Sequence, residues 1–271
     1  MLADVVDDLV CSLCGAEVSL DGRTVRCSAG HSFDVARHGY VSMLVGRGPR
    51  TGDTAEMVGA RRRFLGAGHY SPLRDAVVAA CAGAPPGCVV DVGAGTGYYL
   101  AAVLTAPPDR TGIALDSSPA ALRVAARCHS RVGAVACDAW SGLPVRTSAA
   151  GVVLNVFAPR NGAEMHRVLA PDGVLVVVTP TDAHLRELVA APGLVSVDAA
   201  KERRVEEALG PWFDETSSVV VDHEMSLSRA EACDALAMGP SARHVVPDPA
   251  ALPERVRVRA SARVTTYCPR P

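Results

Sequence analysis

The chain has 271 residues, of which 49% are hydrophobic and 21% charged, and its formal net charge is −2. This length accommodates one full α/β domain with a small appendage, and the composition is ordinary for a globular protein. No apolar run reaches the roughly 20 residues that a membrane-spanning helix needs. The acidic start MLADVVDDLVC also lacks the basic and apolar regions of a signal peptide. We therefore expect a cytoplasmic protein that does not coat nucleic acid indiscriminately.

Charge is distributed unevenly along the chain. Residues 1–34 carry a net charge of −4, whereas residues 35–74 carry +5, all of it from arginine. A local basic segment suits a selective RNA-binding protein, because cationic side chains contact phosphates. A solvated arginine-rich helix has the same composition, so charge alone does not decide between the two interpretations.

The first motif is a set of potential metal ligands near the N-terminus. Cys11, Cys14, Cys27 and His31 follow the spacing C-x2-C-x12-C-x3-H, which is typical of a tetrahedral Cys3His zinc site. Between the two ligand pairs, residues 19–26 place an Asp-Gly turn between apolar residues. This pattern predicts a β-hairpin that brings the second pair of ligands back beside the first.

The same segment indicates what the metal does. Nine cysteines in a cytosolic chain argue against disulfides. Four ligands within 21 residues also make unrelated thiols a poor explanation. A segment this short has no core of its own, so metal binding would supply its folding energy. Four protein ligands leave no open position, which favours a structural rather than a catalytic zinc ion.

From about residue 86 the pattern changes to short apolar strands, several of them followed by helical stretches. Such segments occupy residues 88–104, 110–128, 134–140, 150–159 and 173–180. Strands that alternate with helices predict a mostly parallel sheet with helices on both faces, as in Rossmann-like α/β domains.

The loop after the first of these strands, DVGAGTG, is typical of a cofactor-binding turn. Gly93, Gly95 and Gly97 allow a bound cofactor to approach the backbone closely. Dinucleotide-binding loops use G-x-G-x-x-G instead and do not place an acid beside the pyrophosphate. The G-x-G-x-G spacing and the acidic Asp91 therefore favour S-adenosylmethionine, whose methionine moiety carries a cationic amino group.

Three further polar residues are predicted to lie where strands end. Asp116 is placed to accept hydrogen bonds from ribose hydroxyls, Asp138 to hold an adenine amino group, and Asn155 follows the fourth strand. Ligands bind at the carboxyl ends of strands in open α/β sheets. Each acid taken singly is more often a helix cap or turn residue. Their order along the chain nevertheless favours S-adenosylmethionine.

Most of the chain resembles the RlmA/TlrB family of bacterial 23S rRNA guanine-N1 methyltransferases. The resemblance rests on the zinc motif together with segments 33–44, 52–73, 91–100, 115–122, 158–160, 168–188 and 238–245. The zinc motif and the block GDTAEMVGARRRFLGAGHYSPL (52–73) are far more specific than the methyltransferase fold, which many unrelated enzymes share.

The resemblance implies an activity. A methyl group passes from S-adenosylmethionine to N1 of one guanine in a hairpin loop of 23S rRNA, near the macrolide site of the exit tunnel. The composition, rich in Ala, Gly, Val and Arg, is typical of an actinobacterial source. This favours the branch that acts at about nucleotide 748 and is associated with resistance to tylosin-like macrolides; about nucleotide 745 is the other position. The family also implies a homodimer whose cleft receives the RNA.

The resemblance also implies residue roles. It makes Cys11, Cys14, Cys27 and His31 the zinc ligands, and adds Tyr70, Gly97, Tyr98 and His184 as cofactor contacts. Tyr70 would otherwise be a core aromatic and His184 a helix-surface residue. A small pool of aromatic residues is available for base stacking, namely Phe33, Tyr40, Phe64, Trp140 and Phe157.

Removal of the guanine N1 proton requires a base or stabilisation of the negative charge that develops at O6. Asp53, Glu56 and Glu164 are candidate bases, and Arg61, Arg62 and Arg63 are candidate partners for O6, by composition only. The sequence selects none of them, so the catalytic residues stay open.

We therefore expect a zinc-binding module over residues 1–36, a basic linker or helical segment over 37–85 that contributes to RNA and cofactor binding, and a methyltransferase domain over 86–271. Two alternatives are a small-molecule methyltransferase, which would need neither zinc nor an arginine cluster, and a binding protein that has lost catalysis. The intact glycine loop and the strand-end acids argue against the second.

Overall fold

The computed structural model describes residues 1–46, 52–105, 109–189, 201–239, 250 and 252–271. Two parts of the sequence motifs lie outside these residues. They are 47–51 of the basic segment and 240–245 of the late motif MGPSARHV.

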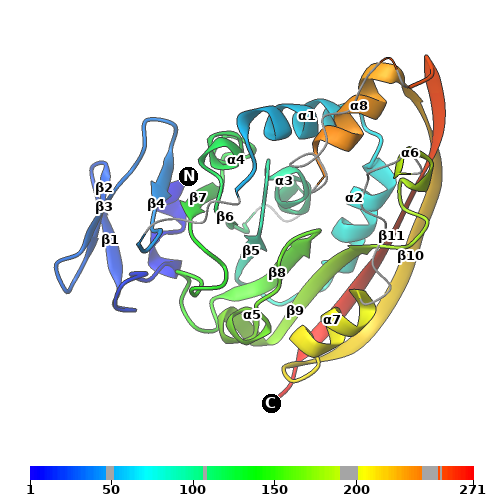
Figure 1. The fold of residues 1–271 in the computed structure, drawn as a ribbon. Helices are drawn as coiled ribbons and strands as arrows, with labels where there is room; N and C mark the ends of the chain where they lie inside the picture. The colour runs from blue at the N-terminus through cyan, green and yellow to red at the C-terminus, as the bar shows by residue number, and fades with distance from the viewer. Residues whose placement is uncertain (47–51, 106–108, 190–200, 240–249, 251) are drawn as a thin grey trace.

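The N-terminal module is a small three-stranded antiparallel sheet. Two short 3-10 helices, Leu2–Asp4 and Val6–Asp8, precede β1 (Val18–Asp21), β2 (Thr24–Cys27) and β3 (Ser32–Asp34). Asp21 pairs with Thr24 across a two-residue turn at Gly22, whose φ of +58° suits a hairpin. The predicted hairpin is confirmed. It lies at one end of the molecule, on the left in Figure 1.

The main sheet has eight strands, in the order β10-β11-β9-β8-β5-β6-β7-β4. They are β4 (Tyr40–Ser42), β5 (Cys88–Val92), β6 (Gly112–Asp116), β7 (Val132–Ala136), β8 (Ala150–Val156), β9 (Leu169–Pro180), β10 (Phe213–Ser228) and β11 (Arg255–Pro269). From β9 to β4 all neighbours are parallel, whereas β11 is antiparallel to both β9 and β10. The predicted mostly parallel sheet is confirmed.

Helices cover both faces of this sheet, as expected. One face packs against α1 (Ala55–Gly66), α2 (Ser71–Ala80), α3 (Tyr98–Thr105), α4 (Pro119–Ala125) and α8 (Arg229–Ala237). The other packs against α5 (Gly162–Val168), α7 (Lys201–Leu209) and the N-terminal module. A short helix, α6 (Arg186–Val189), follows β9. In β6, Ala114 faces the first core, whereas Ile113 and Leu115 face the second, because successive strand residues point to opposite faces.

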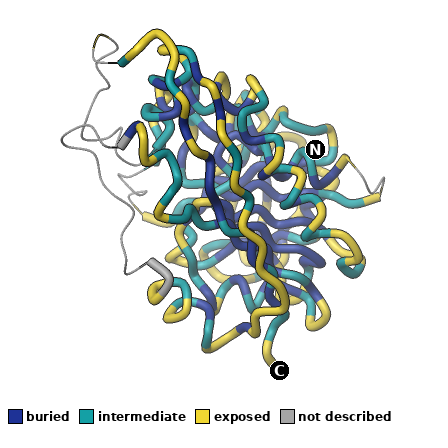
Figure 2. The backbone as a smooth tube through the Cα atoms, turned by 90° about the vertical axis from the view of Figure 1, so that its right-hand side faces the viewer, coloured by how far each residue is buried: buried dark blue, intermediate teal, exposed yellow. Residues whose placement is uncertain are grey.

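Two features of the sheet lie outside the predicted pattern. The three-residue β4, within the expected basic segment 37–85, adds to the edge of the sheet by pairing in parallel with β7. At the opposite edge, β10 and β11 form a long antiparallel pair, and β10 is exposed over most of its length (Figure 2). The segment 37–85 thus supplies a strand and two helices to the larger domain.

Among the described residues, no helix combines the length and apolar character needed to cross a membrane.

Candidate active site and metal centre

The four predicted metal ligands come together in the N-terminal module. The donor atoms of Cys11, Cys14, Cys27 and His31 all lie within 4.8 Å of one another. The Cys11 Sγ lies 3.5 Å from His31 Nδ1, and the Cys14 Sγ lies 3.4 Å from Cys27 Sγ. Such separations fit the corners of a tetrahedron around zinc, where Zn–S bonds are about 2.3 Å long.

The surroundings of Cys27 favour the thiolate that binds a metal. Burial opposes ionisation, but hydrogen bonds from the Ala29 backbone N–H and from His31 lower the pKa of the Cys27 thiol to about 6. The Ala29 nitrogen lies 3.3 Å from the sulfur. One of the three thiols can therefore lose its proton near neutral pH, as a zinc-binding thiolate requires.

The second site is a cavity of about 780 Å³ at the carboxyl ends of β5, β6, β8 and β9, in the upper part of the usual range for ligand pockets. Eight of the ten predicted cofactor residues line it. They are Tyr70, Asp91, Gly93, Gly95, Tyr98, Asp116, Asp138 and His184.

Two acids at its floor have different environments. Asp91 is 2% exposed, and burial, together with the charge of Asp116, raises the pKa of its carboxyl to about 8. Burial also raises the pKa of Asp116, but the backbone N–H groups of Ser118 and Gly95, each 2.8 Å from an Asp116 oxygen, oppose the shift. Asp91 therefore gains most from a cationic ligand, since an opposite charge favours its ionised form.

Tyr70 and His184 form a hydrogen-bonded pair at the pocket wall. The Tyr70 hydroxyl lies 2.9 Å from His184 Nε2, and His184 Nδ1 accepts from the Ser261 backbone N–H at 3.2 Å. Because Nδ1 accepts, the neutral ring carries its proton on Nε2 and donates it to the Tyr70 oxygen. The Tyr70 hydroxyl proton is then available to a ligand. Burial raises the pKa of Tyr70, so the hydroxyl stays protonated.

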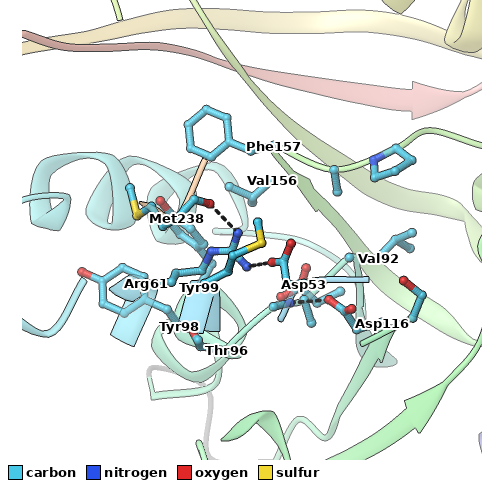
Figure 3. Close-up of a pocket in the computed structure, with 18 of the residues that line it drawn as sticks. Asp53, Arg61, Val92, Thr96, Tyr98, Tyr99, Asp116, Val156, Phe157 and Met238 are labelled. Atoms are coloured by element: carbon cyan, nitrogen blue, oxygen red, sulfur yellow. Dashed lines mark hydrogen bonds and ion pairs between the residues drawn. The ribbon is translucent and has the colours of Figure 1, made fainter. Parts of the chain in front are cut away.

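An ion pair between Asp53 and Arg61 lies over the glycine loop (Figure 3). The Arg61 guanidinium also donates to the Met238 carbonyl at 2.8 Å, and the Ser118 hydroxyl donates to the Asp53 carbonyl at 2.6 Å. A Cβ on Gly95 would lie 3.2 Å from Arg61 Nη1. These contacts explain how the distinctive 52–73 block reaches the cofactor pocket, which its sequence alone did not show.

Two predicted cofactor residues, Gly97 and Asn155, are not among the residues that line the cavity. Asn155 is fully buried, and its Nδ2 donates to the Pro159 carbonyl at 2.8 Å, so it supports the loop after β8. Gly97 lies where the glycine loop packs on the end of α4: a Cβ there would be 2.5 Å from Cys128 Sγ. Their contact with the cofactor stays a prediction.

Replacement of Gly97 by alanine is expected to lower both stability and cofactor affinity. Gly97 has φ +74°, and the added Cβ would also press on Cys128. Left-handed backbone and overpacking each cost about 1–3 kcal/mol. Urea unfolding and cofactor titration measure the two effects. In the matched control, Gly66→Ala at the end of α1, no atom lies within 4 Å of the new Cβ, and we expect little change. A Gly97→Ala enzyme as stable as the wild type would contradict this packing role.

The aromatic residues predicted for base stacking differ in burial and in whether they line the cavity. Phe64 is fully buried against Tyr70 and is excluded. Phe33 and Tyr40 are partly exposed but do not line the cavity. Trp140 and Phe157 do line it and are 65% and 40% exposed.

Phe157 also has φ +53°, a strained conformation for a side chain of this size. Strain of this kind is found mostly where structure is held for function. Phe157 is therefore a strong candidate for contact with the substrate.

Of the candidate bases, only Asp53 lines the cavity. Glu56 is exposed on α1 and does not line it. Glu164 accepts from Arg167 and from the Leu143 backbone N–H at 2.7 Å, a structural arrangement. Among the arginines, Arg63 pairs with Asp234 on α8.

Comparison with known proteins found two family models and several relatives that match this chain. A family model described as the N-terminal zinc ribbon of RlmA matches residues 9–45, and one described as a methyltransferase domain matches residues 89–173. The chain is 47% identical to a protein from Micromonospora griseorubida over 99% of this chain and all of the other. That protein is provisionally assigned as a 23S rRNA (guanine-N1) methyltransferase.

A second relative is the 23S rRNA (guanine(748)-N(1))-methyltransferase of Streptomyces fradiae. It is 45% identical over 92% of this chain and 90% of its own length. The chain belongs to the family of 23S rRNA (guanine-N1) methyltransferases. A more distant relative, YxjB of Bacillus subtilis, provisionally given the same activity, is 32% identical over 66% of each chain.

As a member of this family, the protein is a methyltransferase that uses S-adenosylmethionine and holds a structural zinc ion. The cavity is large enough for this cofactor, at about 780 Å³, and two acids, Asp91 and Asp116, line it, which suits a ligand with a cationic group and hydroxyl groups. The loss of a methyl group from the sulfonium supplies the chemistry, and the protein supplies alignment.

Proposed function

We propose that the enzyme methylates N1 of the guanine at nucleotide 748 in a hairpin loop of 23S rRNA, with nucleotide 745 as the alternative position, and thereby confers resistance to tylosin-like macrolides. The observation that carries this proposal is the 45% identity to the Streptomyces fradiae enzyme named for guanine 748, over 92% of this chain.

The geometry supports an RNA substrate. The exposed rings of Trp140 and Phe157 at the cavity offer stacking surfaces for an unpaired base. A second cavity, of about 690 Å³, lies between the zinc ribbon and the larger domain and shares Cys137 and Asp138 with the first. Arg146 and Arg167 line this second cavity. A strand of RNA in this groove would run directly into the cofactor pocket.

The roles of the site residues belong to the same proposal. Asp91 binds the cationic amino group of the cofactor, Asp116 its ribose, and Asp138 its adenine, while Tyr70 and His184 act as a hydrogen-bonded pair. Gly93, Gly95, Gly97 and Tyr98 form the loop around the methionine moiety, and Asn155 supports the opposite loop. The enzyme acts in the cytoplasm as a homodimer, with a zinc module over 1–36, a basic segment over 37–85 and a methyltransferase domain over 86–271.

The test is methyl transfer from labelled S-adenosylmethionine to unmodified 23S rRNA, followed by reverse transcription. N1 methylation blocks Watson–Crick pairing, so the modified base stops the polymerase. We expect a single stop at nucleotide 748, which disappears when that guanine is changed to adenine. A stop at 745 would assign the enzyme to the other branch. No incorporation by an enzyme that still binds the cofactor would indicate a small-molecule methyltransferase.

Drug resistance is tested separately, by the growth of a tylosin-sensitive host. Expression of the wild-type enzyme is expected to raise the inhibitory concentration of tylosin, and expression of an Asp91→Asn enzyme is expected to raise it less. Equal inhibition in both strains, with nucleotide 748 methylated in the first, would separate the methylation from resistance.

A further inference from the structure

Arg160 is a cation that the cofactor site does not account for. It lies in the loop between β8 and α5, is partly buried, and lines the same cavity as Asp91 and Phe157. Its Nε is buried and, within the part of the chain that the structure describes, has no hydrogen-bond partner. An unsatisfied buried donor on a charged group costs more than one on a neutral group, so this side chain is suited to a ligand that accepts hydrogen bonds.

The loop that carries Arg160 is held firmly. The Phe157 backbone N–H donates to the Val178 carbonyl at 3.1 Å, and Asn155 Nδ2 donates to the Pro159 carbonyl at 2.8 Å. On the far side, Asn161 Nδ2 donates to the Ala139 carbonyl at 2.9 Å. Donors fixed before the reaction stabilise developing charge without reorganisation. The backbone that presents Arg160 to the cavity is therefore fixed before a ligand binds.

The position of Arg160 relative to the cofactor residues indicates which ligand it meets. Asp91 and Asp116 lie at the carboxyl ends of β5 and β6, whereas Arg160 follows β8, close to Phe157 in sequence. Phe157 has its ring 5.6 Å from that of His184, and Asn161 binds next to the exposed Trp140. Arg160 thus lines the same cavity as the two exposed rings, Phe157 and Trp140, on which the target base would stack.

On the basis of the proposed function, we infer that Arg160 donates hydrogen bonds to O6 of the target guanine and stabilises the negative charge that forms when N1 loses its proton. Guanine presents O6 as an acceptor next to N1–H, and an arginine is the usual partner of that oxygen. A cation beside O6 lowers the pKa of N1, because an opposite charge favours the anionic form.

The step balances without any further reactant. The N1 proton passes to solvent water, and its electron pair is shared between N1 and O6 beside Arg160. The N1 electron pair then forms the bond to the methyl carbon while the bond from that carbon to sulfur breaks. The sulfur keeps the bonding pair, so the sulfonium becomes a neutral thioether, and the product is a neutral N1-methylguanine.

The experiment compares Arg160→Gln and Arg160→Lys with the wild type in single-turnover methylation of 23S rRNA from about pH 6.5 to about pH 9. We expect Arg160→Gln to lose about 100- to 1,000-fold in rate at pH 7, as for the loss of one preorganised donor. The loss should shrink as pH rises, since N1 then ionises without help. The rate of Arg160→Lys should lie between the rates of the wild type and Arg160→Gln. The cofactor Kd should be unchanged, and the thermal midpoint should not fall.

The matched control is Arg203→Gln, which removes an exposed arginine on α7 that pairs with Glu207, and it should methylate normally at every pH. Three results would overturn the inference. A raised cofactor Kd would place Arg160 on the cofactor carboxylate. A pH-independent loss, with the slope of log affinity against log salt reduced by about 0.7, would place it on an RNA phosphate. An unchanged rate would give it no role.

Failure of the inference and failure of the proposed function are distinguishable. If the wild-type enzyme produces no N1-methylguanine, the proposed function fails. If it does, and Arg160→Gln shows no pH-dependent loss, only the role of Arg160 fails.

Discussion

Replacement of Asp91 by asparagine is expected to weaken S-adenosylmethionine binding by about 10- to 100-fold at pH 8.5, and far less at pH 6. A hydrogen bond to a charged partner contributes about 1.5–3 kcal/mol, and each 1.4 kcal/mol is tenfold in Kd. Burial and the charge of Asp116 raise the pKa of Asp91 to about 8 in the free pocket. At pH 6 the carboxyl is therefore protonated and resembles the neutral amide.

The pH dependence has a definite sign. Wild-type affinity should rise as pH increases from 6 towards 8.5, because the cationic amino group favours ionised Asp91. Below pH 8, binding should release a proton, which titration calorimetry in buffers of different ionisation enthalpy detects. Asp91→Asn should lose both effects. The control is Asp75→Asn, an exposed partner of Arg74 on α2. A Kd ratio between Asp91→Asn and wild type that does not change with pH would contradict the assignment.

The same carboxyl links the stability of the free enzyme to pH. The pKa of about 8 in the folded protein lies above the ordinary aspartate value of 3.8, so between these pH values the folded state binds more protons than the unfolded state. The free energy of unfolding therefore falls as pH rises through this window, by up to about 1.4 kcal/mol per pH unit from this group. Asp91→Asn should remove that contribution. The ionised Asp91 carboxylate thus lowers the stability of the empty enzyme, and it contributes favourably only when a cationic ligand is bound.

Local patterns explain the parts of the site that the sequence predicted. The four zinc ligands flank one hairpin: Cys11 and Cys14 precede β1, and Cys27 and His31 lie at the end of β2 and just after it, so a short local pattern brings them together. Asp91 and Asp116 lie at the carboxyl ends of neighbouring parallel strands, and these ends meet at one edge of the sheet. In both cases the relevant geometry is set by a few consecutive residues or by a general rule of parallel sheets.

Other features depend on contacts between distant segments. β4 has three residues, too few for a period-2 pattern, and only its pairing with β7 makes it a strand. The Arg61 contacts to Asp53 and Met238 likewise join segments far apart in the chain. Asn155 was placed correctly at a strand end, but its side chain points into the backbone of the following loop. Strand position alone does not give side-chain direction.

One missed element did have a signal. β11 begins with the alternation Arg-Val-Arg-Val-Arg over residues 255–259, which is typical of a half-buried strand. Val258 is 1% exposed, and its neighbours Arg257 and Arg259 point outward to pair with Glu224 and Asp222 on β10. Its partner β10 carries no such pattern, because most of its residues are exposed. The sequence pattern therefore predicts β11 but not its partner β10.

Loss of zinc is expected to abolish rRNA methylation while cofactor binding is retained. Cys27→Ser removes one of four ligands, and structural zinc contributes on the order of 10 kcal/mol to the folding of small modules. The ribbon would therefore unfold. Within the described part of the chain, the residues that line the cofactor cavity begin at Gly52, so the ribbon does not contribute to its wall.

The ribbon nevertheless packs on the larger domain, which sets the expected size of the effect. The Arg146 backbone N–H donates to the Asp8 carbonyl at 2.8 Å, and Val25 and Leu9 belong to the same core as Val135 of β7. Unfolding of the ribbon would expose this surface and remove one wall of the groove beside Asp138. We expect the thermal midpoint to fall by several degrees and methylation to fall by at least about 100-fold, as for the loss of several RNA contacts of about 1–3 kcal/mol each.

The measurements are zinc content by native mass spectrometry, proteolysis within residues 9–45, cofactor Kd and rRNA methylation. Cys268→Ser is the matched control, since this half-buried cysteine lies near the C-terminus, outside the ligand cluster. It should keep one zinc ion and full activity. Normal methylation by a zinc-free Cys27→Ser enzyme would show that the ribbon has no part in RNA recognition. Equal loss of cofactor binding and methylation would instead mean that the zinc ion stabilises the whole chain, because the core of the ribbon is continuous with the core beneath the sheet.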